Sequence, residues 1–502
     1  MLLPRPHVMW LSTIPNVMAI LNPVIVYPLT MYKKFVFFLL LACLSIFNIN
    51  PVLAQSATPT VGPVYIIQPG DSLSSIATQF GVTLEDLMTA NNITDPNSIS
   101  AGAQVIIPGL QGISGILNTE IIGYGDTLKS LSRRNQIDEI FLRKLNHITS
   151  PSELYAGVSL VLPQKKDFTP LNRRIVLTNN ESLLEASVLE NTDPWSVIAS
   201  NNLQNSWQVI VGDVFYTPNN IPDVTNEVNG LPEVLLKVTI NPLPMTQGGT
   251  TVLNVQTKPG TKLDGTLSDK PLHFFAQTDG EFVALQGINA MLPPGPYPIK
   301  LNATLPDGSK QSFEQMVVVR TPITPYPNDP MLSVDPATID PAITIPETKQ
   351  IETLTTPATP QKYWQGMFGL PVDQVYCLKS WFGNRRAYNG GNYENFHGGL
   401  DFGICSDLHP FDIYAPADGV VVYTGTLIVR GNATIIDHGW GIYTGYWHQE
   451  KILVNVGDHV TTGQLIGNIG ETGRVTGPHL HWEIWVNGNQ VDPSDWLNNI
   501  YP

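Results

Sequence analysis

Charged side chains are scarce in this chain of 502 residues, because Asp, Glu, Lys and Arg make up only 14% of it, and the net charge is −15. So few basic residues argue against a phosphate-binding surface, and we therefore expect no nucleic acid partner. Scarce charge also disfavours long salt-bridged helices, whereas 42 Pro and 41 Gly favour short strands joined by turns. The composition and length predict a multidomain, mainly β protein.

Cysteine is rare as well, with three residues in the whole chain. Cys43 falls in the N-terminal leader, which leaves Cys377 and Cys405 near the C-terminus. In an exported domain this pair predicts one disulfide closing a short loop. The alternative is two buried thiols that never meet.

Long hydrophobic runs are also missing. Lys33 and Lys34 precede the apolar run Phe35–Leu44, and small residues at Val52 and Ala54 follow it. The run is shorter than the roughly 20 residues that span a bilayer, and the pattern is that of a secretory signal. We interpret residues 1–54 as a leader and signal peptide, and expect an extracellular or cell-wall/periplasm location.

Two details of the leader stay open. Five prolines interrupt the first thirty residues, which makes Met31 an alternative start of the protein. A lipid anchor on Cys43 is the alternative to simple secretion, because the three residues before it loosely resemble a lipobox.

A spacing of 55 residues recurs through the first half of the chain. Gly70-Asp71-Ser72-Leu73 returns at residues 125–128 and, more weakly, at 180–183. The same spacing links further anchors: Asn91, Asn146 and Asn201; Gly102, Gly157 and Gly212; Pro108, Pro163 and Pro218. These matches predict three tandem repeats, at residues 63–109, 119–164 and 174–219.

Each repeat predicts a small unit of strand, two helices and strand. In the first, we expect Asp71 or Ser72 to cap a helix by accepting hydrogen bonds from its free N–H groups. The expected elements are strand Tyr65–Gln68, helix Leu73–Phe80 ended by Gly81, helix Leu84–Ala90 and strand Val105–Ile107.

This pattern resembles the LysM module, a βααβ fold that binds glycans containing N-acetylglucosamine, such as peptidoglycan. The resemblance implies that the sugar lies between the first helix and the turn after the second. It places these residues of the first repeat near the glycan: Asp71, Ser72, Leu73, Asn91, Asn92 and Ile93. The third repeat lacks the Gly-Asp pair, so we expect it to be degenerate and to act as a spacer.

Residues 232–320 read as six short strands separated by Gly and Pro turns, which predicts a small β-sandwich. This segment has no cluster of reactive side chains, so we interpret it as a spacer. Residues 321–360 hold nine prolines and many threonines, which predicts an extended, semi-rigid linker.

The chain contains no H-E-x-x-H motif, which excludes the helical zincin arrangement. Its histidines nevertheless gather after residue 396. His397 and Asp401 share one side of an expected extended segment, because two glycines between them oppose a helix. His479 and His481 likewise project to one side of a strand. Two imidazoles and one carboxylate suit a catalytic zinc, since they leave a fourth position for water.

Residues 361–502 resemble the lysostaphin-type zinc peptidases, also called Gly-Gly or murein endopeptidases. The matching segments, in chain order, are Phe382-Gly383-Asn384-Arg385, His397-x-x-x-Asp401, residues 415–420, Tyr446-Trp447-His448, residues 457–460, residues 463–467 and Gly477-Pro478-His479-Leu480-His481. The resemblance implies an antiparallel β-sheet domain with one Zn²⁺ per chain.

The same resemblance assigns the site residues. It places the zinc ligands on His397, Asp401 and His481, and the catalytic histidines on His448 and His479, with His479 as the general base. Glu483 shares their face of the strand and is either an orienting carboxylate or part of a rim salt bridge.

Two functional hypotheses follow. In the first, a secreted zinc endopeptidase is held on peptidoglycan by its repeats and cuts stem peptides or cross-bridges. In the alternative, the chain is a non-enzymatic cell-wall-binding activator of an amidase. Decayed members with that role lose metal ligands, whereas this chain keeps all five positions, which favours the enzyme. We expect no stable oligomer.

Overall fold

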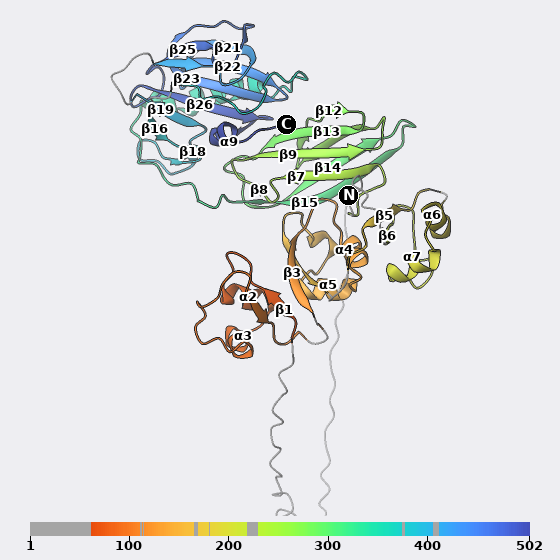
Figure 1. The fold of residues 1–502 in the computed structure, drawn as a ribbon. Coiled ribbons are helices and arrows are strands. Elements are labelled where there is room, and N and C mark those ends of the chain that lie inside the picture. Colours follow the sequence, from red (N-terminus) through yellow and green to blue (C-terminus); the bar gives the residue numbers. More distant parts are fainter. Residues whose placement is uncertain are drawn as a thin grey trace, which may run out of the picture. The chain divides into compact units, whose positions relative to one another are not determined.

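The computed structural model describes residues 62–110, 113, 115–164, 169–179, 181–217, 229–373, 377–404 and 411–502. The predicted leader with Met31 and Cys43 lies outside these residues, as does Cys405. Cys377 is disulfide-bonded, but its pairing with Cys405 stays a prediction. Among the described residues, no helix is both long and apolar enough to cross a membrane. The described chain is mainly β (Figure 1).

The N-terminal part holds three units with the order strand, helix, helix, strand. The first comprises β1 (Val64–Ile66), α2 (Leu73–Phe80), α3 (Leu84–Ala90) and β2 (Gln104–Ile106). The second comprises β3 (Ile116–Ile121), α4 (Leu128–Asn135), α5 (Glu139–Leu145), a 3-10 turn (Pro151–Glu153) and β4 (Ser159–Gln164). The third comprises β5 (Arg173–Val176), α6 (Leu183–Leu189), α7 (Pro194–Ser200) and β6 (Val214–Thr217). The first two units share one sheet, in the order β2-β1-β3-β4.

The repeated residues have repeated structural roles. Ser72 caps α2 by accepting from the Ser75 N–H, so of the two predicted caps it is Ser72 that serves. The amide of Asn91 donates to the carbonyls of Leu87 and Ile106 and accepts from the Ile106 N–H. Asn146 and Asn201 make the equivalent bonds to the strands that end their own units. The Asn that recurs every 55 residues therefore joins the second helix of each unit to the strand that closes that unit.

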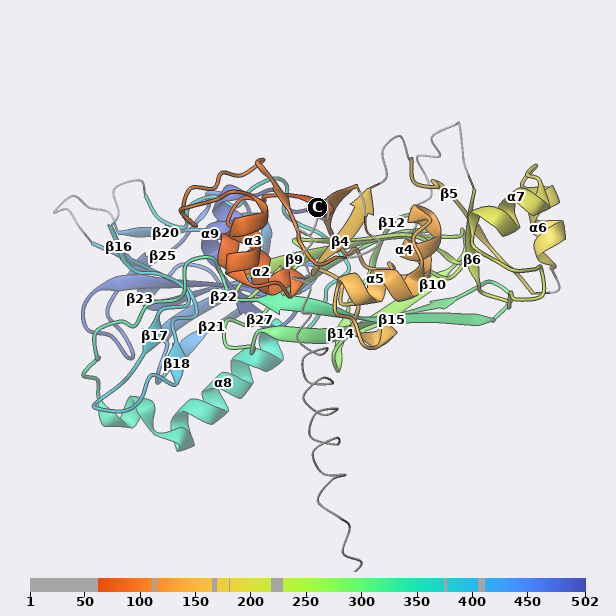
Figure 2. The same cartoon turned by 90° about the horizontal axis from the view of Figure 1, so that it is seen from below.

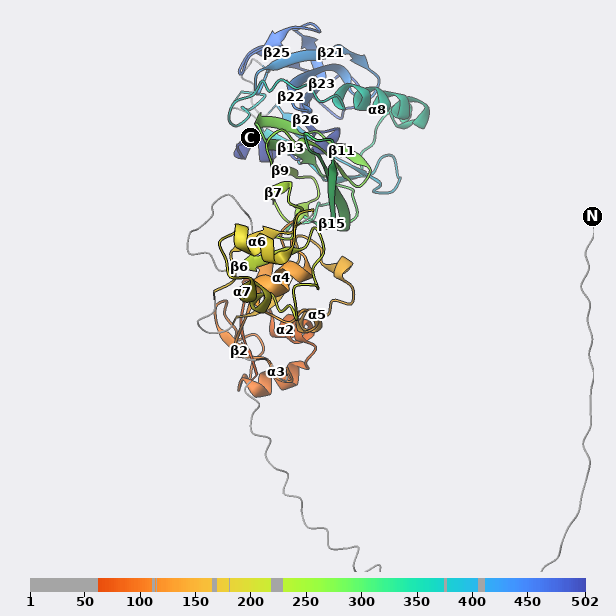
Figure 3. The same ribbon diagram turned by 90° about the vertical axis from the view of Figure 1, so that its right-hand side faces the viewer.

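Two sheets follow, which lie as two layers in Figure 3. One has the order β11-β10-β14-β15-β8 and the other β12-β13-β9-β7. Their bounds are β7 (Leu235–Asn241), β8 (Met245–Thr246), β9 (Thr250–Thr257), β10 (Lys262–Leu267), β11 (Lys270–Leu272), β12 (Phe275–Thr278), β13 (Glu281–Gly287), β14 (Gly295–Thr304) and β15 (Lys310–Arg320). One hydrophobic core takes side chains from both sheets, including Leu253, Ala284 and Leu301. The six expected strands omit β8, β10 and β11, which are short or interrupted by Gly and polar residues.

The prediction of an extended linker over residues 321–360 is wrong for half of its length. The structure has a 3-10 turn at Pro336–Ile339 and a helix, α8, at Pro341–Thr355 (Figure 2). Asp340 caps α8 and Pro341 occupies its first turn, where a missing N–H costs nothing. Ile351 of α8 then packs with Trp447 and Trp485 in a buried cluster. Tertiary packing of this face outweighs the proline-rich composition.

The C-terminal domain is built on a ten-stranded sheet, whose main path runs β16-β19-β26-β23-β22-β21-β24. Its elements are β16 (Cys377–Ser380), β17 (Arg385–Arg386), β18 (Asn395–Phe396), β19 (Leu400–Gly403), β20 (Asp412–Tyr414), β21 (Gly419–Leu427), β22 (Gly431–Gly439), β23 (Ile442–Ile452), β24 (His459–Val460), β25 (Leu465–Ile469), β26 (His479–Val486), β27 (Asn489–Val491) and α9 (Pro493–Asn498). The central strands are antiparallel, and β19 and β23 flank β26. Because a strand pairs with β26 on each side, the backbone positions of β26 and the directions of its side chains are fixed.

The two-sheet domain and the C-terminal domain share a hydrophobic core. Val252 and Val283 pack in the same cluster as residues of β19 and β26. Phe275 stacks on Trp440 with ring centroids 4.8 Å apart, and the Trp496 indole donates to Thr250 Oγ1. The two domains therefore pack against each other through side chains and are not joined by the connecting chain alone.

Candidate metal centre

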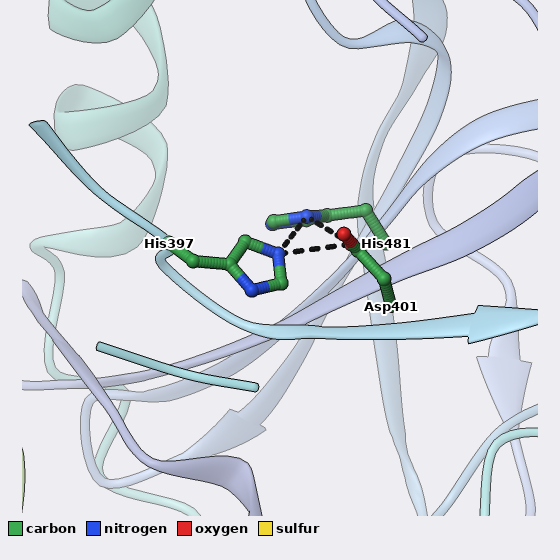
Figure 4. A group of neighbouring side chains, drawn as sticks. All are labelled: His397, Asp401 and His481. Carbon is green, nitrogen blue, oxygen red and sulfur yellow. Dashed lines mark hydrogen bonds and ion pairs between the residues drawn. The ribbon is translucent and has the colours of Figure 1, made fainter. Parts of the chain in front are cut away.

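His397, Asp401 and His481 converge at one point in the C-terminal domain (Figure 4). His397 Nε2 lies 2.9 Å from Asp401 Oδ1 and 2.8 Å from His481 Nδ1, and Asp401 Oδ1 lies 2.8 Å from His481 Nδ1. All three residues are buried. Asp401 and His481 are opposite each other on β19 and β26, whereas His397 comes from the loop between β18 and β19.

Two glycines let the His397 loop approach the sheet. A Cβ on Gly399 would lie 2.1 Å from the Trp482 carbonyl oxygen. A Cβ on Gly398 would lie 2.3 Å from Gln490 Nε2. The first clash is with backbone, so only glycine fits at position 399, whereas the end of the Gln490 side chain can move away from a Cβ at position 398. Close approach of the loop to the Trp482 backbone is the physical reason for the glycine at position 399.

The hydrogen bonds of the two imidazoles determine which nitrogen faces the centre. His397 Nδ1 lies 2.8 Å from the Trp381 carbonyl oxygen, which can only accept, so Nδ1 donates and Nε2 keeps its lone pair. His481 Nε2 donates in the same way to Glu483 Oε1 at 2.8 Å, which leaves the lone pair on Nδ1. Glu483 thus orients the imidazole of His481, one of the two roles expected from the sequence.

Three electron-pair donors therefore point at each other, and this arrangement fits a bound cation. Two imidazole nitrogens and one carboxylate oxygen are the donor set of catalytic zinc sites, which keep a fourth position open. Burial lowers the pKa of His397 to about 4, against the opposing effect of Asp401, so this imidazole is neutral and able to ligate. For Asp401, burial alone would raise the pKa, but His397 and His481 outweigh it and hold the pKa well below its ordinary value.

His448 and His479 lie beside this cluster. Their ring centroids are 4.9 Å apart, and His479 Nε2 is 3.6 Å from Asp401 Oδ1. His448 Nδ1 donates to the Thr472 carbonyl and His479 Nδ1 to the Gly477 carbonyl, so each keeps a lone pair on Nε2. Burial lowers the pKa of both imidazoles, which keeps them neutral at pH 7. Both can accept a proton.

A groove of about 970 Å³ contains all five residues. Its walls also carry residues that the sequence analysis did not single out, including Asp329, Arg386 and Arg474. Arg386 Nη2 donates to Asp401 Oδ2 at 2.9 Å. The positions of Asp329, Arg386 and Asp401 along the chain give no sign that these residues are neighbours. Only the tertiary fold brings them together.

The predicted glycan residues of the first repeat are used mostly within the repeat itself. Asp71 Oδ2 accepts from the Gln68 N–H and from the Tyr65 hydroxyl, Leu73 is fully buried, and Asn91 is bonded to β2. Asn92 and Ile93 line a shallow hollow together with residues of α3, and Asp71, Ser72 and Leu73 do not line it. The structure therefore does not bring the six predicted residues into one pocket.

Comparisons with known proteins agree with this geometry. Residues 395–493 match peptidase family M23, and residues 65–108 and 121–163 match the LysM domain. The chain thus carries an M23 metallopeptidase domain preceded by two LysM domains. The third predicted repeat lies outside the matched ranges. Zinc is the metal of this peptidase family, in agreement with the His-Asp-His donor set.

Among curated proteins, the chain is 42% identical over 122 residues to the peptidoglycan DD-endopeptidase ShyA of Vibrio cholerae, an alignment covering 24% of this chain and 28% of ShyA. It is 39% identical over 97 residues to the DD-carboxypeptidase/endopeptidase Mpg of Neisseria meningitidis, covering 19% and 22% of the two chains. A solved structure, the catalytic domain of lysostaphin from Staphylococcus simulans, is 31% identical, with 25% of this chain and 93% of that chain covered and a TM-score of 0.22. The chain spans under a third of the length of these two curated relatives.

Proposed function

We propose that this protein is an exported zinc endopeptidase that hydrolyses peptide bonds in the stem peptides or cross-bridges of peptidoglycan. The observation that carries the proposal is the convergence of His397, Asp401 and His481 in a groove that also holds His448 and His479. The relative ShyA, named as a peptidoglycan DD-endopeptidase, supports the substrate class, and the match to peptidase family M23 at residues 395–493 includes all five of these residues.

Each residue has a role in this proposal. His397, Asp401 and His481 would hold the zinc ion, which would supply a Lewis acid able to polarise a peptide carbonyl and to make a water molecule nucleophilic near neutral pH. His479 accepts the proton of the attacking water at Nε2 and passes it to the leaving amine. His448, beside it, is assigned to stabilise the negative charge that develops on the carbonyl oxygen. This role requires a proton on His448 Nε2, which the developing negative charge favours.

The N-terminal repeats hold the enzyme on its polymeric substrate. We assign glycan binding to the first repeat, at Asp71 to Leu73 and Asn91 to Ile93, and we treat the third repeat at residues 174–219 as a degenerate copy. Tethering raises the local concentration of cleavable peptide without adding a catalytic contact. Residues 232–320 form a β-sandwich that spaces the repeats from the peptidase domain, as the shared core of the two sheets supports.

Export by a signal peptide in residues 1–54 would deliver the enzyme to its substrate in the cell wall or periplasm. We expect the protein to act as a monomer. The alternative, a non-enzymatic activator of an amidase, is disfavoured because such a protein needs no intact donor set.

Digestion of purified peptidoglycan tests the proposal. The chain downstream of the signal peptide, residues 55–502, is incubated with peptidoglycan with and without a zinc chelator, and the fragments are identified by mass spectrometry. New peptide termini that disappear with chelator and with His479→Ala support the endopeptidase. Folded, zinc-loaded protein that releases no fragments from several wall types, but stimulates an added amidase, would favour the activator.

A further inference from the structure

The segment before the predicted peptidase domain forms one wall of the catalytic groove. Asp329, Leu332, Val334, Thr344 and Thr348 all line it. Backbone bridges join Asn328 to Arg385 and Leu332 to Tyr388, and α8 packs on the sheet through Ile351. A stretch that the sequence predicts to be a linker thus lines the groove, and at two separate places it contacts residues that neighbour the catalytic centre.

The first place is Asp329. Its carboxylate accepts from Asn384 Nδ2 at 2.7 Å, from Ser380 Oγ at 3.0 Å and from Arg386 Nε at 3.3 Å. The side chain of Asp329 is only 16% exposed, so its charge is compensated mainly by these donors. Three donors from residues 380–386 therefore converge on one acid of the linker.

Arg386 carries this contact to the metal centre. While its Nε faces Asp329, its Nη2 donates to Asp401 Oδ2 at 2.9 Å. The other oxygen, Oδ1, is the one that meets His397 and His481. Arg386 thus occupies one carboxylate oxygen of Asp401 and turns the other towards the histidines, and Asp329 holds the guanidinium in place.

The second place is Glu347, which lies on the buried face of α8. Its carboxylate accepts from the backbone N–H of Val429 at 2.8 Å and of Arg430 at 3.2 Å, and from Arg430 Nη1 at 2.9 Å. The Glu347 side chain is 6% exposed. One buried acid of the linker therefore fixes the turn between β21 and β22.

The Val429–Arg430 turn also holds the backbone of His448 in position. The His448 N–H donates to the Arg430 carbonyl at 2.9 Å, and His448 has φ of 63°, a conformation that side-chain-bearing residues rarely adopt. The Val429 carbonyl accepts from the Arg474 N–H, which belongs to the loop whose Thr472 carbonyl holds His448 Nδ1. Glu347 therefore supports both backbone contacts that orient this imidazole.

We propose that Asp329 and Glu347 are positioning residues of the peptidase, with Asp329 aligning the ligand Asp401 through Arg386 and Glu347 aligning His448 through the Val429–Arg430 turn. The catalytic unit then begins near residue 328 instead of residue 361. This inference rests on the proposed function for the role of His448, but the effect of Asp329 on metal binding is independent of the reaction.

Zinc affinity tests the first half in the 55–502 protein. Asp329→Asn keeps the size of the side chain but loosens Arg386, so we expect the zinc dissociation constant to rise about tenfold, the usual effect of a residue that supports a metal ligand. Asp329→Glu restores the charge and is expected to recover part of the affinity. Unchanged zinc affinity in a folded Asp329→Asn protein would overturn this half, whatever its thermal stability.

Kinetics test the second half. Glu347→Gln should lower kcat about tenfold or more with KM within about twofold, because a misplaced His448 affects the reaction more than binding. Zinc affinity should stay unchanged, since His448 is no ligand. Glu352→Gln is the matched control, because this acid lies on the same helix but is exposed. Loss of thermal stability with wild-type kcat would mean that Glu347 only stabilises the fold.

A third measurement separates failure of this inference from failure of the proposed function. NMR spectra of ¹⁵N-histidine-labelled protein report the environment of the His448 ring without any substrate. If the wild type cleaves no peptidoglycan, the proposed function fails, but shifted His448 signals in Glu347→Gln and not in Glu352→Gln still support the positioning role. Identical His448 signals in all three proteins would overturn it.

Discussion

Asp401 and His481 are direct neighbours across strands β19 and β26, and Asp401 Oδ1 lies 2.8 Å from His481 Nδ1. A cross-strand pair in the middle of a sheet is held by backbone hydrogen bonds on both sides, so its geometry does not depend on flexible loops. Only His397 reaches this pair from a loop, and that loop is pinned by the His397 N–H bond to the Asn384 carbonyl. The donor set is therefore preorganised by the fold.

Loss of one donor should abolish zinc binding at this centre. For Asp401→Ala, we expect zinc affinity to fall by more than about 100-fold, beyond the range for residues that only support a ligand, and peptidoglycan cleavage to disappear. Isothermal titration with zinc and the digestion assay measure the two effects. Asp264→Asn, an exposed acid on β10, is the control. Wild-type zinc affinity in Asp401→Ala would show that the metal is held elsewhere.

Glu483 should affect zinc binding without being a ligand. It accepts the N–H of His481 at Nε2 and so fixes which nitrogen of that ring faces the centre. Glu483→Gln keeps an acceptor but removes the charge, and we expect a loss of about tenfold in zinc affinity, with a larger loss for Glu483→Ala. Competition with a coloured zinc chelator gives the dissociation constants. Equal affinities in the two variants would contradict an orienting role.

Gly399 should be intolerant of any side chain. In Gly399→Ala the new methyl group would lie 2.1 Å from the Trp482 carbonyl oxygen, so β18 and β19 must shift relative to β26. We expect a loss of about 3 kcal/mol or more in the free energy of unfolding, measured by urea denaturation. Gly477→Ala is the matched control, because its Cβ would meet nothing within 4 Å. A Gly399→Ala protein as stable as the control would mean that the loop has room to relax.

Sequence patterns foresaw local structure well where a single signal dominates. The helices Leu73–Phe80 and Leu84–Ala90 have the expected bounds, because a capping residue begins each one and Gly81, in the left-handed conformation, ends the first. The strand with His479 and His481 also follows from strict alternation, with the intervening Leu480 fully buried. The sequence motifs also indicated that His397, Asp401 and His481 form one group, and the structure brings these three residues together.

Contacts between distant parts of the chain were beyond the sequence. Asp329 meets Arg386 across 57 positions, and Glu347 meets Arg430 across 83. Neither acid has a local pattern that distinguishes it from an exposed one, and nine prolines nearby made an extended linker the natural interpretation. The resemblance to the LysM module places Asn91 near a glycan, but spacing does not say whether an amide bonds a sugar or its own backbone. In the structure the Asn91 amide bonds the backbone of Leu87 and Ile106, and the contact with Ile106 is one that no local pattern shows.

Asp495, in the first turn of α9, should make the fold less stable at neutral than at acidic pH. Burial, with a smaller contribution from Asp492, raises its pKa to about 6. Tyr326 and Tyr501, which also face this carboxyl group, offer it no positive charge. Between pH 4 and 6 the unfolded chain loses this proton while the folded protein keeps it, so the free energy of unfolding falls as the pH rises through this window.

Asp495→Asn removes this titration. We expect the variant to be more stable than the wild type at pH 7.5, by on the order of 1–3 kcal/mol, and the difference to vanish near pH 3.5, where both states of the wild type are protonated. Urea denaturation at a series of pH values measures it, with Glu471→Gln, an exposed acid, as the control. A constant difference across the series would mean that Asn stabilises α9 by another route. A loss of stability at pH 7.5 would show that the ionised carboxylate stabilises this helix N-terminus, where the helix dipole attracts negative charge.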